Sequence, residues 1–421
     1  MFLLFLKKLC EMRPILLFIL FLLFFTSCKD GVKKDPISTS ETAERLVQIM
    51  ENPAEENSQL PRLFSNDEGL YFSWVAQKDS MAVMNYSVLK NNSWMPASEI
   101  IMGNDWFNNW ADFPAIAENG GNILSSILQK SANGTYTYDV KLNLYNAKNN
   151  SWKNNFILHD DGTQSEHGFV SMLPWEEDQF FVTWLDGRET VGKGHGGGQM
   201  TLRGAFITSE GEIVNDVELD PRICDCCQTS VAKTANTILV AYRDRDDEEI
   251  RDISVLRFVD GFWTQPLTIG NDNWKIPGCP VNGPSIDAFE EGVAVVWFTA
   301  ASGEGDVMVA FSSDSGESFG PSFRIDAGSA TGRVDIAMIN DKEAAVLWMQ
   351  PKGEDEVIYL MKINSHGYTG NPIIISKTSP ERASGFPQLE LLGDTLYFAW
   401  TSLGEESIPS VKMASYRVTD L

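Results

Sequence analysis

Residues 293–326, VAVVWFTAASGEGDVMVAFSSDSGESFGPSFRID, decide the fold of this chain of 421 residues. An apolar run closes on Trp297, a second apolar run begins at Asp306, and a turn of Ser, Asp and Gly leads into a third segment. Short apolar runs that alternate with such turns are typical of antiparallel β-strands. The stretch therefore predicts three consecutive strands of one sheet.

The same pattern recurs along the chain. Six further runs end in the same register, at intervals of 51 to 58 residues, and close on Trp74, Ile127, Trp184, Tyr242, Trp348 and Trp400. Another short strand precedes each run, and a four-stranded unit repeated at a near-constant interval indicates a β-propeller. We predict an all-β propeller of seven four-stranded blades, with six as the alternative because the second unit is the weakest. The repeated aromatic residues are expected to fill the core between blades.

The predicted propeller spans 59–421, after a polar tether at 28–58 and a signal peptide at 1–27. The last unit lacks an obvious fourth strand, so residues between 40 and 58 are expected to supply it and close the ring. Lys7, Lys8 and Arg13 come before an apolar run that leads to "FTSC" and Cys28. A basic start, a short apolar run and small residues are the pattern of a secretory signal. Met12 alone would also begin a complete signal, so translation starts at Met1 or Met12.

The segment before Cys28 resembles the lipobox of bacterial lipoproteins, in which the cysteine becomes the lipidated first residue. That resemblance implies a cell-envelope protein, lipid-anchored in the outer membrane or at the cell surface of a Gram-negative bacterium. The lipid is then the protein's contact with the membrane. A formal net charge of −25 argues against nucleic acid as a partner, because nucleic acids attract basic surfaces. We expect a monomer.

Four cysteines follow Cys28, and three of them lie together in RICDCCQTSV, residues 222–231. The predicted compartment is oxidising, so two disulfides among Cys224, Cys226, Cys227 and Cys279 are the first expectation. A metal site that combines these thiols with His167 or His195 is an alternative, and such ligands suit zinc or copper. A reactive thiol is a third. No other cofactor is expected.

Propellers usually carry their functional residues at one mouth of the central channel, before the innermost strands and in the loops between second and third strands. The innermost-strand starts give Arg62, Asp112, His167, Cys226, Cys227, Gln228, Asn282, Arg333 and Gly385. The loops give Asp186, Arg188, His195, Arg243, Asp244, Arg245, Glu248, Glu249, Arg251 and Ser302. Cys279 also falls at this mouth, so the four thiols are expected to be neighbours across two blades.

The segment SSDSGESF, 312–319, fits the Asp box of sialidase-like BNR-repeat propellers. "CDCCQTSVA", "GCPVNGP" and "GRVDIA" resemble bacterial secreted proteins of the exo-α-sialidase type. The resemblance covers roughly 60–420 and implies an exo-glycosidase that acts on acidic sugars such as sialosides, with a carbohydrate or glycoconjugate as partner. It also implies an arginine grip on the sugar carboxylate. The candidate catalytic residues are Arg188, Arg243, Arg245, Arg333, Asp186 and Glu249.

The sequence departs from the sialidase pattern in two ways. The Arg-Ile-Pro signature of the first blade is missing, and no Tyr–Glu pair can be assigned. Whether the protein is an enzyme is therefore left open. A non-catalytic propeller that binds carbohydrate or protein is one alternative, and a metal-binding propeller that uses the Cys and His residues is the other.

Overall fold

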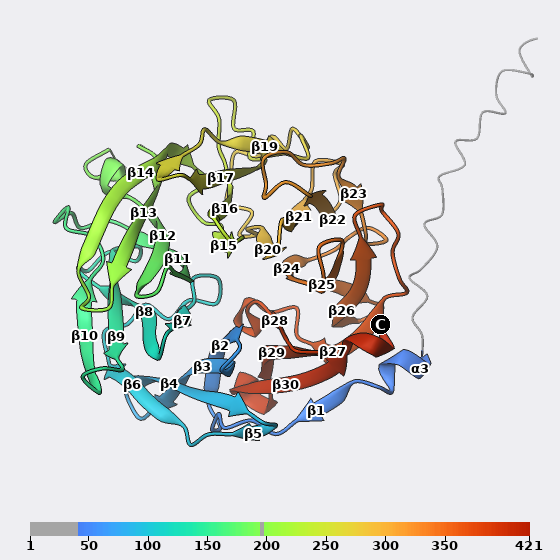
Figure 1. Cartoon of the computed structure of the whole chain (residues 1–421), viewed down its shortest axis with the longest axis horizontal. Coiled ribbons are helices and arrows are strands. Elements are labelled where there is room, and N and C mark those ends of the chain that lie inside the picture. Colours follow the sequence, from blue (N-terminus) through green and yellow to red (C-terminus); the bar gives the residue numbers. More distant parts are fainter. Residues whose placement is uncertain (1–40, 194–197) are drawn as a thin grey trace, which may run out of the picture. The chain divides into compact units, whose positions relative to one another are not determined.

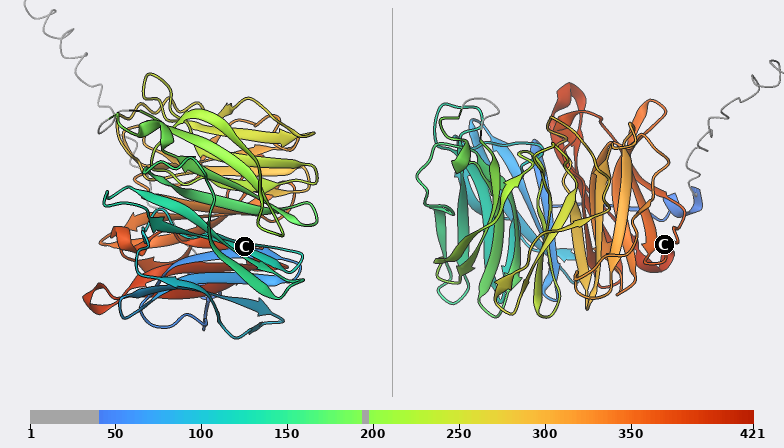
Figure 2. Two further views of the ribbon diagram at one scale, coloured as in Figure 1. Left: turned by 90° about the vertical axis from the view of Figure 1, so that its left-hand side faces the viewer. Right: turned by 90° about the horizontal axis from the view of Figure 1, so that it is seen from above.

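The computed structural model describes residues 41–193 and 198–421, and these form seven antiparallel sheets arranged around one axis, each built on a path of four strands (Figure 1). The chain is therefore a seven-bladed all-β propeller, as the repeat predicted, and the second unit is a complete blade. In the side views the blades stand next to one another, and loops emerge at both faces (Figure 2).

The elements of the first three blades are β2 (Ser58–Asn66), β3 (Gly69–Lys78), β4 (Met81–Lys90), β5 (Ser93–Trp94) and β6 (Ser98–Gly103); β7 (Ile116–Asn119), β8 (Asn122–Lys130), β9 (Tyr138–Asn146) and β10 (Ser151–Ile157); β11 (His167–Trp175), β12 (Gln179–Asp186), β13 (Met200–Thr208) and β14 (Ile213–Ile223). The next two blades are β15 (Ser230–Lys233), β16 (Thr237–Arg243), β17 (Ile253–Val259), β18 (Phe262–Trp263) and β19 (Leu267–Ile269); β20 (Ser285–Phe289), β21 (Gly292–Thr299), β22 (Asp306–Ser312) and β23 (Phe323–Arg324). The last two are β24 (Gly332–Met338), β25 (Glu343–Lys352), β26 (Asp355–Asn364) and β27 (Ile373–Thr378); β28 (Gln388–Leu392), β29 (Thr395–Leu403), β30 (Pro409–Arg417) and β1 (Gln48–Met50). Short helices are α3 (Glu41–Glu44), η1 (Arg188–Thr190), η2 (Arg382–Ser384), η3 (Glu405–Ser407) and η4 (Val418–Asp420).

The last blade is closed by a strand from the other end of the chain. β1 pairs antiparallel with β30, with Gln48 opposite Ser415, and completes the sheet β1-β30-β29-β28. This pairing confirms the expectation that residues before 58 supply the missing strand. β1 therefore belongs to the propeller although it lies inside the range assigned to the tether. The signal peptide, Cys28 and the first part of the tether lie outside the described residues.

The repeated aromatic residues form the core between blades. Trp184, Trp297 and Trp348 have no exposed surface, and Trp74 and Tyr242 are 1% exposed. The buried indole N–H groups find acceptors: that of Trp184 donates to Asp186 Oδ2 at 3.0 Å and that of Trp297 to Asp272 Oδ2 at 2.7 Å. Large apolar rings thus fill the space between sheets, and the strands carrying them are fixed in register.

The turn between β22 and β23 has the hydrogen bonds expected of its Ser-Asp-Gly pattern. Asp314 Oδ1 accepts hydrogen bonds from the Ser312 hydroxyl at 2.6 Å and the Ser318 amide at 3.0 Å. Gly316 adopts a φ of +77°, which favours glycine.

Within residues 41–193 and 198–421, no helix combines the length and the apolar composition that a membrane span requires.

Candidate functional site: a thiol cluster at the channel mouth

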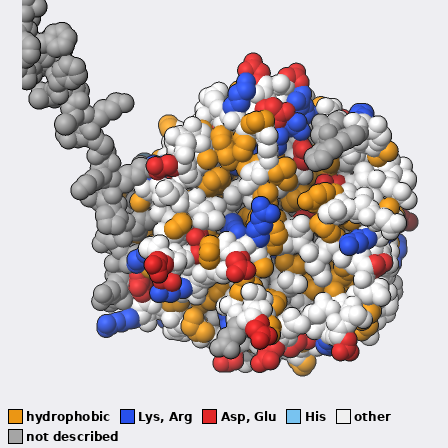
Figure 3. Space-filling model, turned by 180° about the vertical axis from the view of Figure 1, so that it is seen from behind, with side chains coloured by type: hydrophobic (Ala, Val, Ile, Leu, Met, Phe, Trp, Pro, Cys, Tyr) orange, Lys and Arg blue, Asp and Glu red, His pale blue; other side chains and the backbone are white. Residues whose placement is uncertain are grey.

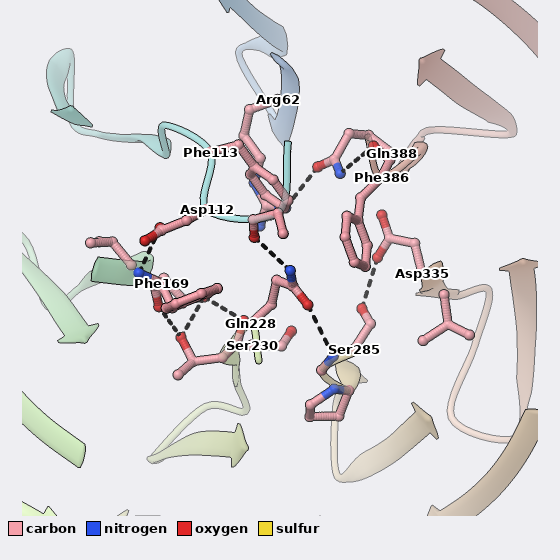
Figure 4. Close-up of a pocket in the computed structure, with 17 residues that line it drawn as sticks. Arg62, Asp112, Phe113, Phe169, Gln228, Ser230, Ser285, Asp335, Phe386 and Gln388 are labelled. Carbon is pink, nitrogen blue, oxygen red and sulfur yellow. Dashed lines mark hydrogen bonds between the residues drawn. The ribbon is translucent and has the colours of Figure 1, made fainter. Parts of the chain in front are cut away.

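The Gln228 side chain crosses the central channel. Gln228 follows the cysteine segment and donates its amide to Ala111 O at 2.5 Å, while its Oε1 accepts the Gly283 amide at 2.9 Å (Figure 4). The cavity around it measures about 50 Å³. Pockets that bind small molecules usually measure about 300–1,000 Å³. In this conformation the channel is therefore a packed axis rather than a ligand pocket.

Buried carboxyl groups line this axis around a single arginine. Arg62 donates to Gln388 Oε1 at 2.7 Å, and Asp335 accepts the Ser285 hydroxyl at 2.7 Å (Figure 4). Burial raises the pKa of Asp112 to about 8, although the Phe169 amide lowers it. Burial likewise raises the pKa of Glu390 to about 8. These acids accept hydrogen bonds across blades, and their geometry ties the innermost strands together.

The thiols lie where the chain passes from β14 to β15. The Cys224 amide donates to Arg243 O at 3.0 Å, which fixes the start of this connection against β16. Cys224 and Cys227 are 1% and 2% exposed, and Cys226 is partly exposed. The connection ends at Gln228 on the channel axis. A short segment between two blades thus directs three sulfur atoms into one small volume.

The three sulfurs are close but not bonded. Cys224 Sγ lies 3.5 Å from Cys227 Sγ and 4.0 Å from Cys226 Sγ, and all three lie within 4.8 Å of one another. A disulfide bond measures about 2.05 Å. All four described cysteines are free thiols. The expectation of two disulfides is therefore not confirmed.

Two arginines place positive charge beside the cluster. Arg251 Nη1 donates to Cys224 Sγ at 3.3 Å, and Arg251 is 3% exposed. Burial acts to raise the pKa of the Cys224 thiol, but hydrogen bonds from Cys226 and Cys227 and the charges of Arg251 and Arg243 hold that pKa well below its ordinary value. The hydrogen bond to Cys224 raises the pKa of Cys226, and burial raises that of Cys227. The directions of these shifts favour ionisation of Cys224 over that of Cys226 and Cys227.

Cys279 approaches from the neighbouring blade. It belongs to the connection between β19 and β20, is exposed, and makes a hydrogen bond with Cys226. It is not one of the three sulfurs that lie mutually within 4.8 Å. The structure thus brings three of the four thiols into one compact group, and Cys279 lies outside that group.

The four arginines proposed as a carboxylate grip are held by the protein itself. Arg243 is 2% exposed and donates to the carbonyl oxygens of Asn282, Phe298 and Arg251, at 2.6 to 3.1 Å. Its guanidinium lies 5.0 Å from the centre of the Trp274 ring. Because its donors point at buried carbonyls, Arg243 fastens the β16–β17 loop to the next blade.

The other three arginines have separate partners. Arg333 donates to Ser384 Oγ at 2.7 Å and Gly385 O at 2.8 Å, and burial lowers its pKa to about 10. Arg188 binds both oxygens of Asp186, at 2.8 and 2.7 Å. Arg245 binds Glu249 at 2.7 Å.

No acceptor atom is shared by two of these guanidinium groups among the described residues. The two candidate carboxylates are ionised. Hydrogen bonds from Arg245 lower the pKa of Glu249 to about 2. Burial would raise the pKa of Asp186, but hydrogen bonds from Arg188 hold it below its ordinary value. The four candidate arginines therefore have separate partners. Glu249 is bound by both Arg245 and Arg251, and Asp186 is bound by Arg188.

His167 belongs to a different cluster from the thiols. Its Nε2 lies 3.1 Å from Asp161 Oδ2 and 3.7 Å from Asp186 Oδ1, and its Nδ1 lies 3.3 Å from Tyr138 O. Its ring stacks on that of His159 with 3.6 Å between centroids. Burial lowers the pKa of His159 to about 4, so this imidazole is neutral at physiological pH. His195, the other predicted imidazole ligand, lies outside the described residues.

Sequence reasoning did not identify Tyr138 and Glu166 as site residues, although it placed Asp112 at the channel mouth. Tyr138 donates to Glu166 Oε1 at 2.7 Å and lies 3.2 Å from Asp112 Oδ2. This is a Tyr–Glu–Asp arrangement that no motif in the sequence reveals, because the three residues come from β9 and two loops. His159 and Asp161 were missed as well; the run HDDG at 159–162 was the available signal.

Charged side chains are unevenly placed on one face of the molecule. The face drawn in Figure 3 has basic side chains near its centre and acidic side chains along its lower rim.

Comparison with known proteins supports the fold. No family model matches the chain, and no curated protein matches it. The polysaccharide lyase Uly1 is similar in structure, with a TM-score of 0.53, 10% identity, and coverage of 86% of this chain and 90% of that chain. At this identity the similarity shows the fold alone.

Two further solved structures match with lower TM-scores. The Hadza microbial sialidase Hz136 has a TM-score of 0.42 and 13% identity over 69% of this chain and 63% of that chain, so the match spans less than two thirds of the sialidase. An α-L-arabinanase of Penicillium chrysogenum has a TM-score of 0.46 and 12% identity, with coverage of 89% and 98%.

Proposed function

We propose that the protein binds one thiophilic metal ion, Cu⁺ or Zn²⁺, through Cys224, Cys226 and Cys227. The observation that carries this proposal is the spacing of the sulfurs, 3.5 and 4.0 Å from Cys224. A metal–thiolate bond of about 2.3 Å gives sulfur separations of about 3.8 Å in a tetrahedral site and about 4.0 Å in a trigonal one. The two separations from Cys224 are close to these values, and Cys226 and Cys227 lie within 4.8 Å of each other. Small shifts of the three side chains would accommodate an ion.

The surroundings of the cluster favour bound thiolates. Thiols bind metals as thiolates, which carry negative charge that a buried site must balance. Arg251 donates directly to Cys224 Sγ, and the Arg243 guanidinium adds a second positive charge. Cys224 and Cys227 are almost completely buried, which limits competition by water and small oxidants. Soft sulfur ligands select Cu⁺ and Zn²⁺ over the hard cations.

The location predicted from the sequence gives the site a context. A lipid anchor at Cys28 would hold the propeller in the bacterial cell envelope, where free copper and zinc ions arrive from outside the cell. A thiolate site there would capture such ions at the membrane surface. The proposed function is therefore metal-ion binding by a lipid-anchored propeller.

Metal titration of purified protein tests this proposal. Untagged protein, reduced and kept anaerobic, is titrated with Cu⁺ and, separately, with Zn²⁺ in competition with a chromophoric chelator. We expect one ion per chain and an affinity that falls by more than about 100-fold in Cys224→Ser and Cys227→Ser, since removal of even an outer partner of a ligand costs about 10–100-fold. Ser80→Ala, at an exposed position before β4, is the control. Equal binding by wild type and Cys224→Ser would overturn the proposal.

A second candidate function is glycoside hydrolysis, and one observation favours it. Tyr138 lies between Glu166 and Asp112, at 2.7 and 3.2 Å. Tyr138 and Glu166 thus form a Tyr–Glu pair of the kind that could not be assigned from the sequence. Burial raises the pKa of Glu166 to about 7, so this carboxyl group can exchange a proton near neutral pH. Tyr138 is 1% exposed, so a substrate could reach it only if the adjoining loops moved.

Turnover of a fluorogenic sialoside distinguishes this second function from the first. A hydrolase would lose activity in Tyr138→Phe and Glu166→Gln and retain it in Cys224→Ser. Arg243→Ala and Arg333→Ala test whether either arginine contributes to substrate binding. Absence of turnover by the wild-type protein would remove this candidate and leave the metal site unaffected.

A further inference from the structure

The four thiols differ in how far they lie from solvent. Cys279 is exposed, Cys226 is partly exposed, and Cys227 and Cys224 are 2% and 1% exposed. Cys279 is therefore the most exposed of the four sulfur-bearing side chains.

The sulfurs also form a row from the exposed cysteine to the buried pair. The side chains of Cys279 and Cys226 interact, and this interaction lowers the pKa of Cys279. Cys226 Sγ lies 4.0 Å from Cys224 Sγ, which lies 3.5 Å from Cys227 Sγ. Neighbouring sulfurs along this row could therefore pass an ion from one to the next.

Cys279 differs from the other three in its attachment to the fold. Cys224, Cys226 and Cys227 share one connection between β14 and β15, whereas Cys279 lies between Gly278 and Pro280 in the connection from β19 to β20. Its distance from Cys226 can therefore change without altering the spacing of the other sulfurs. The three sulfurs already form a complete trigonal set.

The trigonal set also distinguishes between metals. Structural zinc takes four ligands in a tetrahedron. Only three sulfurs lie mutually within 4.8 Å, and Cys279 is outside this group. Asp225, the one carboxylate inside the cysteine segment, is bound by Arg245 at 2.9 Å. Zinc would therefore lack a fourth ligand that the described residues hold in place, whereas Cu⁺ is satisfied by three thiolates.

We propose that the cluster takes up Cu⁺ from thiol carriers and that Cys279 is its entry ligand. This inference rests on the proposed metal-binding function. In the first step Cys279 forms a sulfur–copper bond and a carrier thiolate leaves. In the following steps Cys226 replaces the second carrier thiolate, Cys224 replaces Cys279, and Cys227 binds as the third ligand. Four copper–sulfur bonds form and three break, because the ion passes from two carrier thiolates to three protein thiolates. Each proton lost by a protein thiol goes to a departing thiolate or to water, and copper stays Cu⁺.

Uptake kinetics test this inference with a defined donor. Anaerobic protein is mixed in a stopped-flow instrument with Cu⁺ bound to dithiothreitol, and the sulfur-to-copper charge-transfer absorbance is followed. We expect Cys279→Ser to bind one Cu⁺ at equilibrium with nearly the wild-type affinity but to take it up about tenfold more slowly, the change given by a barrier raised by about 1.4 kcal/mol. Lys275→Ala, at an exposed position in the same connection, is the control and should match the wild type.

The outcomes separate this inference from the proposed function. Wild-type uptake rates in Cys279→Ser would overturn the entry role while Cu⁺ binding itself stands. Loss of equilibrium binding in Cys279→Ser would also overturn it, because Cys279 would then be a permanent fourth ligand. Retained Cu⁺ binding in Cys224→Ser and Cys227→Ser would overturn the proposed function, and the entry role with it.

Discussion

Cys224 Sγ lies 3.5 Å from Cys227 Sγ, and the guanidinium of Arg251 donates to the same Cys224 sulfur at 3.3 Å. A cysteine that is paired with an arginine and flanked by two further thiols could bind a metal ion with only small movements of the three cysteine side chains. The arginine comes from the β16–β17 loop of the fourth blade. The thiols come from the β14–β15 connection, which leads into the same blade.

Removing the charge beside Cys224 should weaken metal binding. Arg251→Gln keeps much of the side-chain volume but deletes the cation, and we expect the affinity for Cu⁺ to fall by about 10–100-fold, as is usual for partners of metal ligands. Arg251→Lys should recover part of the loss. Chelator competition measures the effect. Arg257→Gln, on β17 and away from the sulfurs, is the matched control, and an unchanged affinity in Arg251→Gln would contradict the role of this charge.

Arg333 should prove to be structural. Its guanidinium donates to Ser384 and Gly385 and lies 4.9 Å from the Trp110 ring centre. Arg333→Ala should lower the free energy of unfolding by about 3 kcal/mol, because hydrogen bonds to charged groups contribute about 1.5–3 kcal/mol and a cavity is left behind. The exposed Arg382, 5.9 Å from the same ring, is the control and should have little effect. Urea denaturation that ranks the two variants the other way round would refute this role.

Asp112 should make stability depend on pH. Burial raises its pKa to about 8 from an ordinary 3.8. Between these values the unfolded chain has lost the proton and the folded chain has kept it, so the free energy of unfolding falls as pH rises, by up to about 1.4 kcal/mol per pH unit. Asp112→Asn removes this dependence. Its free energy of unfolding should therefore rise relative to that of the wild type between about pH 5 and pH 8. The exposed Asp394 provides the control substitution. A difference in unfolding free energy that stays constant with pH would rule out the raised pKa.

The lipid anchor is tested by fractionating cells. If Cys28 is acylated, the wild-type protein sediments with membranes and labels with a radioactive fatty acid. Cys28→Ser should remove the label and release the protein into the soluble fraction. Membrane association that persists without label in Cys28→Ser would argue against a lipid anchor at this position.

The blades could be predicted because their signal is local. Trp74, Trp297 and Trp348 end apolar runs at even intervals, and burial of each ring follows from its place in the strand. Closure of the ring by β1 was predictable for a related reason, since the last unit lacked a strand. The neighbourhood of Cys226 and Cys279 followed from their matching positions in adjacent blades.

The chemistry of the mouth was harder to predict because it depends on contacts between blades. Arg243 and Arg333 stand at positions that face the axis, but their donors are taken by carbonyl oxygens of Asn282 and Gly385, which no sequence pattern reveals. Tyr138, Glu166 and Asp112 meet for the same reason. The predicted oxidising compartment favoured disulfides, whereas the structure keeps the sulfurs of Cys224 and Cys227 3.5 Å apart and unbonded.

The X-ray absorption spectrum of the Cu⁺-loaded protein tests the central claim most directly. The account predicts that the shell of nearest neighbours consists of three sulfur atoms at about 2.3 Å, the length of a metal–thiolate bond. It also predicts that this shell is disrupted in Cys224→Ser. A nearest shell of nitrogen or oxygen atoms, or a spectrum that Cys224→Ser leaves unchanged, would contradict it.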